Sequence, residues 1–237
     1  MKTKLESTKK AKRNAALEAV KHVRDGFAIG LGSGSTAAYA IEELGNRIKR
    51  ENIHILGVPT SYQAFTLAVK NKIPLTTLDE HSVLDLAIDG ADQIDDELNM
   101  IKGMGGALAR EKIVASSSKE YIIIADETKK VKVLGENDHP VPIEALPFAF
   151  ALVTHRLEEI GGRAVVREGV GKVGPVITDN GNIIVDAFFG AIREPEKLEH
   201  KLKSIVGVVE TGLFIGMADA VYLGTDTGVR KLRKNRE

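Results

Sequence analysis

The stretch FAIGLGSGSTAAYAIEEL, residues 27–44, decides the fold. It begins with an apolar run over 27–31, passes through a loop of glycine and serine, and continues with apolar residues at helical spacing. The apolar run is typical of a buried strand, and the spacing after the loop predicts a helix over about 36–50. A strand, a glycine loop and a helix in this order are the first half of a β-α-β unit, the building block of parallel sheets.

The same alternation continues through the first half of the chain. Apolar spacing predicts helices over 15–24, 36–50, 60–71 and 106–118, and strands over 27–31, 53–58, 73–78, 83–88 and 121–125. This order predicts an α/β fold, with a Rossmann-like, mostly parallel sheet and helices on both of its faces. Ligands bind such sheets beyond the carboxyl ends of the strands, so the chemistry is expected in the loops after residues 31, 58, 88 and 125.

The pattern changes after residue 135. A short strand near three prolines is followed by a helix over 148–160, a strand over 163–167, the hairpin VITDNGNIIVDA with its turn at Asn180-Gly181, and a helix over 195–204. We therefore expect a small α+β domain of ferredoxin-like type over 136–204. It would be inserted into an α/β catalytic domain formed by 1–135 and 205–237, to which strands over 208–214 and 219–224 return.

Composition and charge exclude several classes of protein. The 33 Lys and Arg balance the 33 Asp and Glu. This balance argues against electrostatic binding of nucleic acid or of an anionic membrane by the protein as a whole. The chain has no Cys, so disulfides and thiolate metal sites are excluded. No apolar run has the length of a membrane span or of a signal peptide, and we expect a cytoplasmic protein. Basic residues at both ends are interpreted as a solvated helix start and a frayed tail.

The loop over residues 32–36 is the first candidate site. Its glycines allow a ligand close to the backbone, its position at a helix start attracts anions, and Ser33, Ser35 and Thr36 add hydroxyl groups, which together suit a phosphate. Residues 32–37 also match the dinucleotide pattern G-x-G-x-x-A, but the acidic residue expected after the second strand is absent. A purely structural glycine turn is the alternative.

Acidic and basic residues follow in two further loops. Asp89 and Asp92 come at the end of the strand over 83–88, where two neighbouring carboxylates can divide proton-transfer work, although Asp-Gly also forms ordinary turns. Lys102 lies in the loop KGMGG and could neutralise a developing oxyanion or a phosphate. On spacing alone, Glu111 on the helix over 106–118 is interpreted as a surface residue. Lys129 follows the strand over 121–125 and could close on the pocket formed by these loops. The six His show no ligand spacing.

In their order these motifs resemble the type A ribose-5-phosphate isomerases. The likeness rests on GLGSGSTAAYAIEEL (30–44), PTS (59–61), DGADQID (89–95), IKGMGGALAREKIVA (101–115), IADETKKV (124–131), VITDNGN (176–182) and GVVETGLF (207–214). Several motifs in register over more than 200 residues are far more specific than any one glycine loop. The resemblance implies an enzyme that interconverts ribose 5-phosphate and ribulose 5-phosphate without a metal or organic cofactor, in a homodimer or homotetramer.

The resemblance also assigns roles to residues. It implies Glu111 as the catalytic base, with Asp89, Asp92 and Lys102 as further catalytic residues. The implied substrate-binding residues are Ser33, Gly34, Ser35, Thr36, Asp89, Gly90, Ala91, Asp92, Lys102, Gly103, Met104, Gly105 and Lys129. The sequence departs from the family pattern at Gln93, where Glu is usual, and at Met104, where Gly is usual, so substrate preference or affinity could differ.

Two other classes of protein remain open at this point. One is a different enzyme on a related scaffold, such as an amino-sugar phosphate isomerase/deaminase or a CoA transferase. A deaminase would be expected to use a His in ring opening, and none of the six lies near these loops. The other is a non-catalytic sensor of sugar phosphates, which would bind pentose phosphate and turn nothing over.

Overall fold

The computed structural model describes residues 2–233, and their side chains from residue 5 onward. The chain divides into two compact units: the described parts of Met1–Ala91, Arg110–Lys129 and Met217–Glu237 form the first, and Asp92–Ala109 with Lys130–Gly216 form the second. Among residues 2–233, none of the helices has the length and apolar character needed to cross a membrane.

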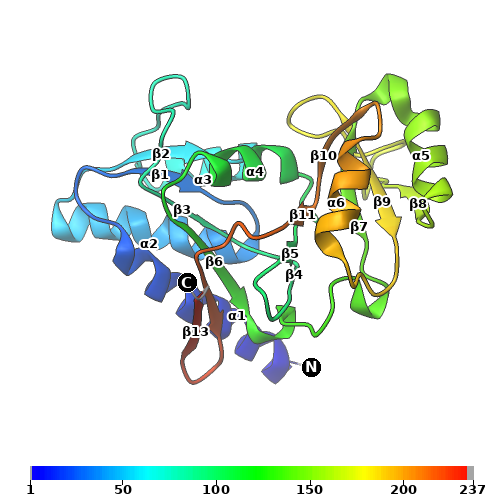
Figure 1. The fold of residues 1–237 in the computed structure, drawn as a ribbon. Coiled ribbons are helices and arrows are strands. Elements are labelled where there is room, and N and C mark those ends of the chain that lie inside the picture. Colours follow the sequence, from blue (N-terminus) through cyan, green and yellow to red (C-terminus); the bar gives the residue numbers. More distant parts are fainter. Residues whose placement is uncertain (1, 234–237) are drawn as a thin grey trace. The chain divides into compact units, whose positions relative to one another are not determined.

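The first unit is built on a six-stranded sheet in the order β13-β12-β6-β3-β1-β2 (Figure 1). Its strands are β1 (Ala28–Leu31), β2 (Leu56–Pro59), β3 (Leu86–Asp89), β6 (Tyr121–Asp126), β12 (Ala220–Gly224) and β13 (Val229–Arg233). All neighbours are parallel except β12 and β13, which pair antiparallel. The mostly parallel sheet is therefore confirmed, and its switch in strand order at β1 and β3 is where such sheets bind ligands.

Helices cover both faces of this sheet. Ile29 and Leu31 of β1 share a core with α1 (Lys2–Ala19), α2 (Ser35–Glu51) and α3 (Tyr62–Lys70). Gly30 points to the other face, where a Cβ atom would lie 2.3 Å from Val114 of α4 (Leu108–Ser116). Because alternate residues of a strand face opposite sides, α4 covers the face opposite to α1, α2 and α3.

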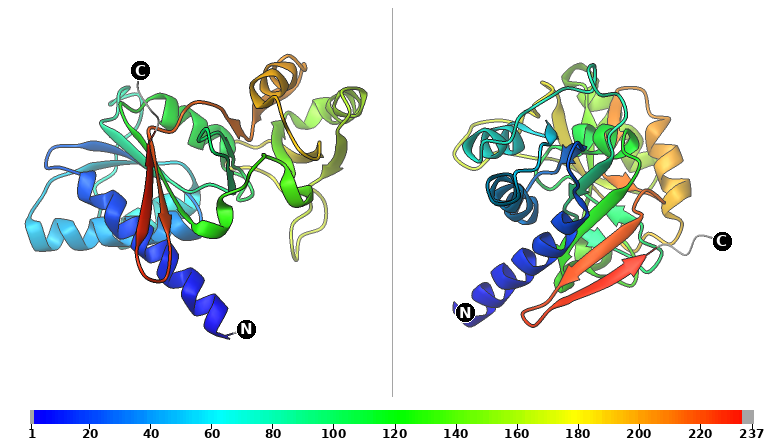
Figure 2. Two further views of the ribbon diagram at one scale, coloured as in Figure 1. Left: turned by 60° about the horizontal axis from the view of Figure 1, so that its bottom comes forward. Right: turned by 90° about the vertical axis from the view of Figure 1, so that its left-hand side faces the viewer.

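Residues 2–14 and 229–233 form regular structure that the sequence analysis did not expect. Helix α1 begins at Lys2 rather than near residue 15 and packs along β6 and β12, as both views of Figure 2 show. The expected frayed tail is wrong: Arg230, Lys231 and Arg233 belong to the edge strand β13, while Lys234 and Arg236 lie outside the described residues. Basic side chains on an edge strand discourage pairing with other chains.

The second unit contains an antiparallel sheet in the order β10-β7-β9-β8. Its elements follow the chain as β7 (Val141–Ala145), α5 (Phe150–Glu159), β8 (Arg163–Val166), β9 (Ile183–Phe188), α6 (Pro195–Lys203) and β10 (Val208–Thr211). This β-α-β-β-α-β order is that of ferredoxin-like folds. Ile143, Val153, Val185 and Leu202 bring both helices and the sheet into one core. The turn at Asn180-Gly181 forms, but the arm before it contributes only the bridge from Ile177 to Ile183.

The second unit also holds a small sheet that the sequence did not predict. Strands β4 (Gln93–Ile94), β5 (Met100–Ile101) and β11 (Leu213–Phe214) have two residues each, too short to show periodicity. The unit therefore extends beyond the expected 136–204 on both sides. The expected return of 208–214 to the main sheet is wrong, because β10 pairs with β7 and β11 with β5.

Four short 3₁₀ turns and one missing strand complete the description of residues 2–233. The expected strand over 73–78 is wrong: it contributes a single bridge between Gly57 and Leu75, since Pro74 has no N–H to extend a ladder. Four turns of 3₁₀ helix join the elements, η1 (Val20–His22), η2 (Glu127–Lys129), η3 (Glu136–Asp138) and η4 (Pro147–Ala149).

Candidate functional site

In the first unit, the carboxyl ends of β1 and β3 bring the glycine loop to Asp89. Asp89 is 2% exposed, and its Oδ1 accepts hydrogen bonds from the backbone N–H of Ser33 (3.0 Å) and of Gly90 (2.7 Å). A Cβ atom at residue 32 would lie 2.3 Å from the same oxygen, so only glycine fits there. The loops after residues 31 and 88, two of the four in which the sequence analysis expected the chemistry, therefore lie together.

The loop is held from the other side by residues that follow β2. The Ser33 hydroxyl lies 2.7 Å from Thr60 Oγ1 and donates to Ser61 Oγ (2.5 Å). The Gly34 N–H donates to Gln63 Oε1 (2.8 Å), and Gly34 has a φ of +95°, a conformation that favours glycine. Thr60, Ser61 and Gln63 were not predicted as site residues, although PTS at a strand's carboxyl end was a usable signal.

The hydroxyl groups at the start of α2 differ in exposure. Ser35 is exposed and accepts a hydrogen bond from the Lys12 ammonium (3.0 Å), whereas Thr36 is 9% exposed. The lysine comes from α1, which the sequence did not connect with the loop. A cation beside the N-terminus of a helix makes this end of the loop favourable for an anion.

Glu111 lies in the first turn of α4 and is 5% exposed. The surface interpretation from spacing alone is therefore wrong, because periodicity does not say which face of a short helix is covered. Its neighbour Arg110 extends over the ring of Tyr62, with the guanidinium carbon 5.6 Å from the ring centroid. A buried carboxylate on a helix is a rigidly placed proton acceptor in a water-poor setting.

Lys129 ends the short helix η2, directly after β6, and is half-buried. The turn before it is fixed by Asp126, whose carboxylate accepts hydrogen bonds from the N–H of Thr128 (3.2 Å) and from its hydroxyl group. This places Lys129 just beyond the carboxyl end of β6, the edge of the sheet at which the sequence analysis expected it.

In the second unit, Asp92 and the loop over residues 102–105 are joined. The Met104 N–H donates to Asp92 Oδ2 (3.0 Å). Lys102 is 2% exposed, its N–H donates to Gly212 O (2.8 Å), and its ammonium lies 5.3 Å from the centroid of the Phe214 ring. The aromatic face interacts favourably with the ammonium group at this buried position.

The two departures from the family pattern have different structural meanings. Gln93 is 5% exposed, accepts a hydrogen bond from the Gly135 N–H (2.7 Å) and donates one to Glu136 O (2.9 Å). Its side chain therefore holds the turn at residues 135–136. Met104 is 43% exposed and its sulfur lies 3.8 Å from Arg167 Nη2, so the side chain is accommodated at the surface without crowding the loop core.

Replacing Gln93 by Glu is expected to lower the free energy of unfolding by about 1–3 kcal/mol. A carboxylate could still accept from Gly135, but it could not donate to the Glu136 carbonyl, which it would repel. Urea denaturation followed by circular dichroism measures the difference. An unchanged unfolding free energy would contradict the role of the amide.

Three other acidic residues near Asp89 and Asp92 in the sequence, Asp85, Asp95 and Asp96, have structural roles. The Lys119 ammonium hydrogen-bonded to Asp85 lowers the pKa of that carboxyl group. Asp95 accepts hydrogen bonds from the N–H groups of Glu97 (3.0 Å) and Asn99 (2.8 Å), and burial raises its pKa. Asp96 pairs with Lys130. These contacts distinguish them from Asp89 and Asp92, which lie against glycine loops.

Each unit thus gathers one group of the expected residues. The first unit brings together Ser33, Gly34, Asp89 and Gly90, and also carries Ser35, Thr36, Ala91, Glu111 and Lys129. The second joins Asp92 to the loop of Lys102, Gly103, Met104 and Gly105. Within the described residues, no three His, Asp or Glu side chains gather in the manner of a metal site.

Comparison with known proteins identifies the family. The model of the family ribose 5-phosphate isomerase A (phosphoriboisomerase A) matches residues 56–228, well over half of the chain. The chain belongs to this family. Ribose-5-phosphate isomerase A of Methanothermobacter thermautotrophicus is 49% identical to it over 222 residues, which are 94% of this chain and 97% of the relative.

Solved structures of ribose-5-phosphate isomerases have the same fold. That of ribose 5-phosphate isomerase A from Methanocaldococcus jannaschii is 48% identical and superposes with a TM-score of 0.92, covering 96% of this chain and all of the other. A second, a D-ribose-5-phosphate isomerase in complex with phospho-erythronic acid, is 47% identical with a TM-score of 0.91, covering 94% and 97%. The resemblance read from the motifs is confirmed.

Proposed function

We propose that this chain interconverts D-ribose 5-phosphate and D-ribulose 5-phosphate, an aldose–ketose isomerisation of the non-oxidative pentose phosphate pathway. Membership of the ribose 5-phosphate isomerase A family carries the proposal, because the match extends over almost the whole of similarly sized relatives. It decides against the deaminase, the CoA transferase and the sensor that the motifs alone left open.

Glu111 is the proposed base. The reaction moves a proton between C1 and C2 through a cis-enediolate, so one group must remove a carbon-bound proton and return it to the neighbouring carbon. A carboxylate that is 5% exposed at the start of a helix is suited to this, because little water competes for the proton. The family position of Glu111 gives independent support.

Asp89 and Asp92 are proposed to bind sugar hydroxyl groups and to move the hydroxyl protons, including the proton transferred when the furanose ring opens. Backbone N–H groups fix both carboxylates, through Ser33 and Gly90 for Asp89 and through Met104 for Asp92. Fixed acceptors lower the entropic part of the barrier, because the hydroxyl groups are already aligned when the ring opens.

Lys102 is proposed to stabilise the negative charge of the enediolate, with the N–H groups of its loop. A buried ammonium needs no reorganisation when the charge develops, which makes its contribution larger than in water. The phosphate is proposed to be held in the first unit, by the loop over residues 33–36, by Gly90 and Ala91 and by Lys129.

The complex of a relative with phospho-erythronic acid supports the proposed reaction. Phospho-erythronic acid joins a phosphate to a carboxylate, which is planar and negatively charged like an enediolate. A site that stabilises the enediolate should therefore bind such an acid more tightly than the neutral carbonyl substrate.

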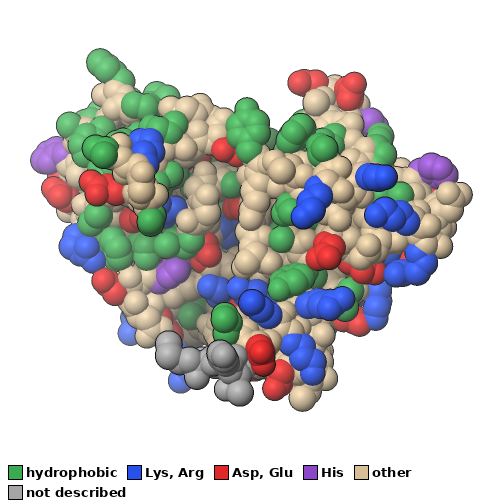
Figure 3. Space-filling model, turned by 180° about the vertical axis from the view of Figure 1, so that it is seen from behind, with side chains coloured by type: hydrophobic (Ala, Val, Ile, Leu, Met, Phe, Trp, Pro, Cys, Tyr) green, Lys and Arg blue, Asp and Glu red, His purple; other side chains and the backbone are tan. Residues whose placement is uncertain are grey.

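We further propose a cytoplasmic homodimer or homotetramer whose small-molecule partner is the pentose phosphate, with no nucleic-acid or membrane partner. Exposed apolar side chains on η4, α5 and β10 support self-association, among them Phe148, Leu152 and Val209. Acidic and basic side chains are interspersed over the face drawn in Figure 3, in keeping with the formal net charge of zero. A chain with no formal net charge exerts little overall attraction on a polyanion.

Turnover of ribose 5-phosphate by the purified chain, with and without a chelator, tests the proposal. We expect ribulose 5-phosphate to form at the same rate under both conditions, because the proposed steps use only side chains and backbone groups. Activity that a chelator abolishes and added metal restores would contradict the mechanism.

A further inference from the structure

Arg167 and Asp186 form a pair that sequence reasoning did not single out. Arg167 directly follows β8, and Asp186 lies in the neighbouring strand β9. Arg167 Nε donates to Asp186 Oδ2 (2.8 Å) and Nη2 donates to Oδ1, so the carboxylate binds the guanidinium with both oxygens. Each side chain is 13% exposed. Such a two-point contact fixes the plane of the guanidinium.

The remaining donors of Arg167 reach the loop that carries Lys102. Nη1 donates to the carbonyl oxygens of Gly103 (2.8 Å) and Met104 (3.0 Å), and Nη2 lies 3.8 Å from the Met104 sulfur. A guanidinium has five N–H groups, and these contacts within the second unit occupy its three nitrogens. Arg167 is therefore built to hold the protein's own backbone rather than a ligand.

Holding two consecutive carbonyl groups fixes two peptide planes. In a planar trans peptide the C=O and the following N–H point in opposite directions. With Gly103 C=O directed at Arg167, the Met104 N–H points the other way, and there it donates to Asp92 Oδ2 (3.0 Å). With Met104 C=O also directed at Arg167, the Gly105 N–H is turned away from the guanidinium.

We propose that Arg167, aligned by Asp186, is a positioning residue for the isomerisation. It sets the peptide orientations that hold Asp92 and that aim the Gly105 N–H at the developing negative charge, without touching the substrate itself. This inference rests on the proposed function, because the N–H groups of this loop are assigned there to the enediolate. Loop donors act on a transition state only when they are aligned beforehand.

Arg167→Lys and Asp186→Asn test the proposal. A lysine keeps the charge but cannot bind a carboxylate with two donors and hold two carbonyls at the same time. We expect kcat for Arg167→Lys to fall at least about tenfold while KM changes less than about threefold, and Asp186→Asn to have a smaller effect of the same kind. Hydrogen exchange at the Met104 amide, measured by NMR, should become at least about tenfold faster in both variants.

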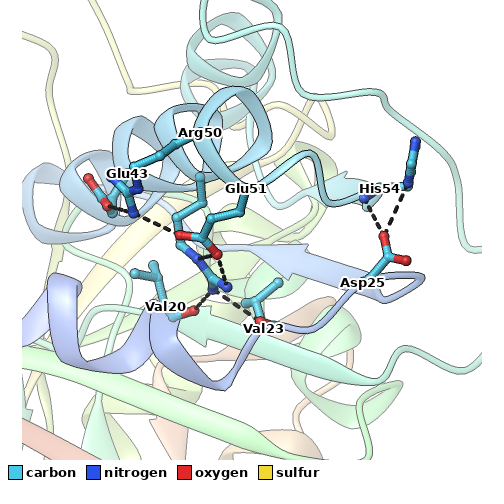
Figure 4. A network of polar contacts seen from close by, with 8 residues as sticks. Val20, Val23, Asp25, Glu43, Arg50, Glu51 and His54 are labelled. Atoms are coloured by element: carbon cyan, nitrogen blue, oxygen red, sulfur yellow. Dashed lines mark hydrogen bonds and ion pairs between the residues drawn. The ribbon is translucent and has the colours of Figure 1, made fainter.

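Arg47→Lys is the matched control. Arg47 in α2 of the first unit pairs with Glu51 and donates to the carbonyl oxygens of Val20 and Val23 (3.0 Å for Val23), an arrangement like that of Arg167; Figure 4 shows Glu51, Val20 and Val23. Arg47→Lys should lower the melting temperature without changing kcat or exchange at Met104.

Several outcomes would overturn the proposal. One is a kcat for Arg167→Lys within twofold of the wild-type value. Another is a loss of kcat in Arg47→Lys equal to that in Arg167→Lys. The third is a loss of kcat in Arg167→Lys with unchanged hydrogen exchange at the Met104 amide. If the wild-type chain itself fails to isomerise ribose 5-phosphate, the proposed function fails instead. Exchange then decides the positioning claim on its own, because unchanged exchange in Arg167→Lys shows that Arg167 does not hold the loop.

Discussion

Glu111→Gln is expected to lower kcat for ribose 5-phosphate by at least about 100-fold, with KM largely retained. Gln has nearly the size and shape of Glu, so the substitution fits the buried position in the first turn of α4. The amide cannot accept a proton from carbon at neutral pH, and the step through the enediolate has no other base in this proposal. Steady-state kinetics in both directions measure the effect.

A buried carboxylate outside the proposed site gives the control. Glu144 in β7 is fully buried, and its Oε1 accepts hydrogen bonds from Thr178 Oγ1 (2.9 Å) and from the amides of Asn180 (3.0 Å) and Asn182 (2.8 Å). Glu144→Gln should lower the melting temperature and leave kcat unchanged. A kcat for Glu111→Gln near the wild-type value would place the base elsewhere.

Lys102→Ala is expected to lower kcat/KM by about 100-fold or more, because the enediolate would lose its charged partner. The loop should remain in place, since Gly103 and Met104 are held by Arg167 and the Lys102 backbone N–H is bonded to Gly212 O. Binding of phospho-erythronic acid, measured by calorimetry, should weaken in parallel with kcat/KM if the ammonium acts on negative charge.

Lys130→Ala is a suitable comparison for Lys102→Ala. Lys130 is 20% exposed and pairs with Asp96, so its loss removes a lysine of the second unit without touching the proposed site. We expect full activity for this variant. Full activity of Lys102→Ala as well would rule out its proposed role.

The sequence predicted the main sheet and the loops of the site because local patterns encode them. Strand β1, the loop around Ser33 and helix α2 appear as an apolar run, a glycine cluster and helical spacing, and parallel pairing then requires the loop to lie next to Asp89. Gly32 illustrates the same point, since its close approach to Asp89 leaves no space for a side chain.

Contacts between residues distant in sequence were beyond such reasoning. Arg167 lies 63 residues from Met104, and only the antiparallel pairing of β8 with β9 brings it to Asp186 and leaves it facing the loop. Gln93 reaches across 42 residues to Gly135. Glu111 was misjudged on spacing alone for a related reason: the burial of one face of a nine-residue helix depends on tertiary packing that no local pattern records.

Isomerisation of ribose 5-phosphate in D₂O, followed by NMR, tests the central claim most directly. Turnover through a cis-enediolate with a carboxylate base should form ribulose 5-phosphate, and solvent deuterium should appear at C1 of the ketose and C2 of the aldose as the reaction cycles. Absence of turnover, or repeated turnover in which no deuterium enters either carbon, would contradict the proposed function and its mechanism.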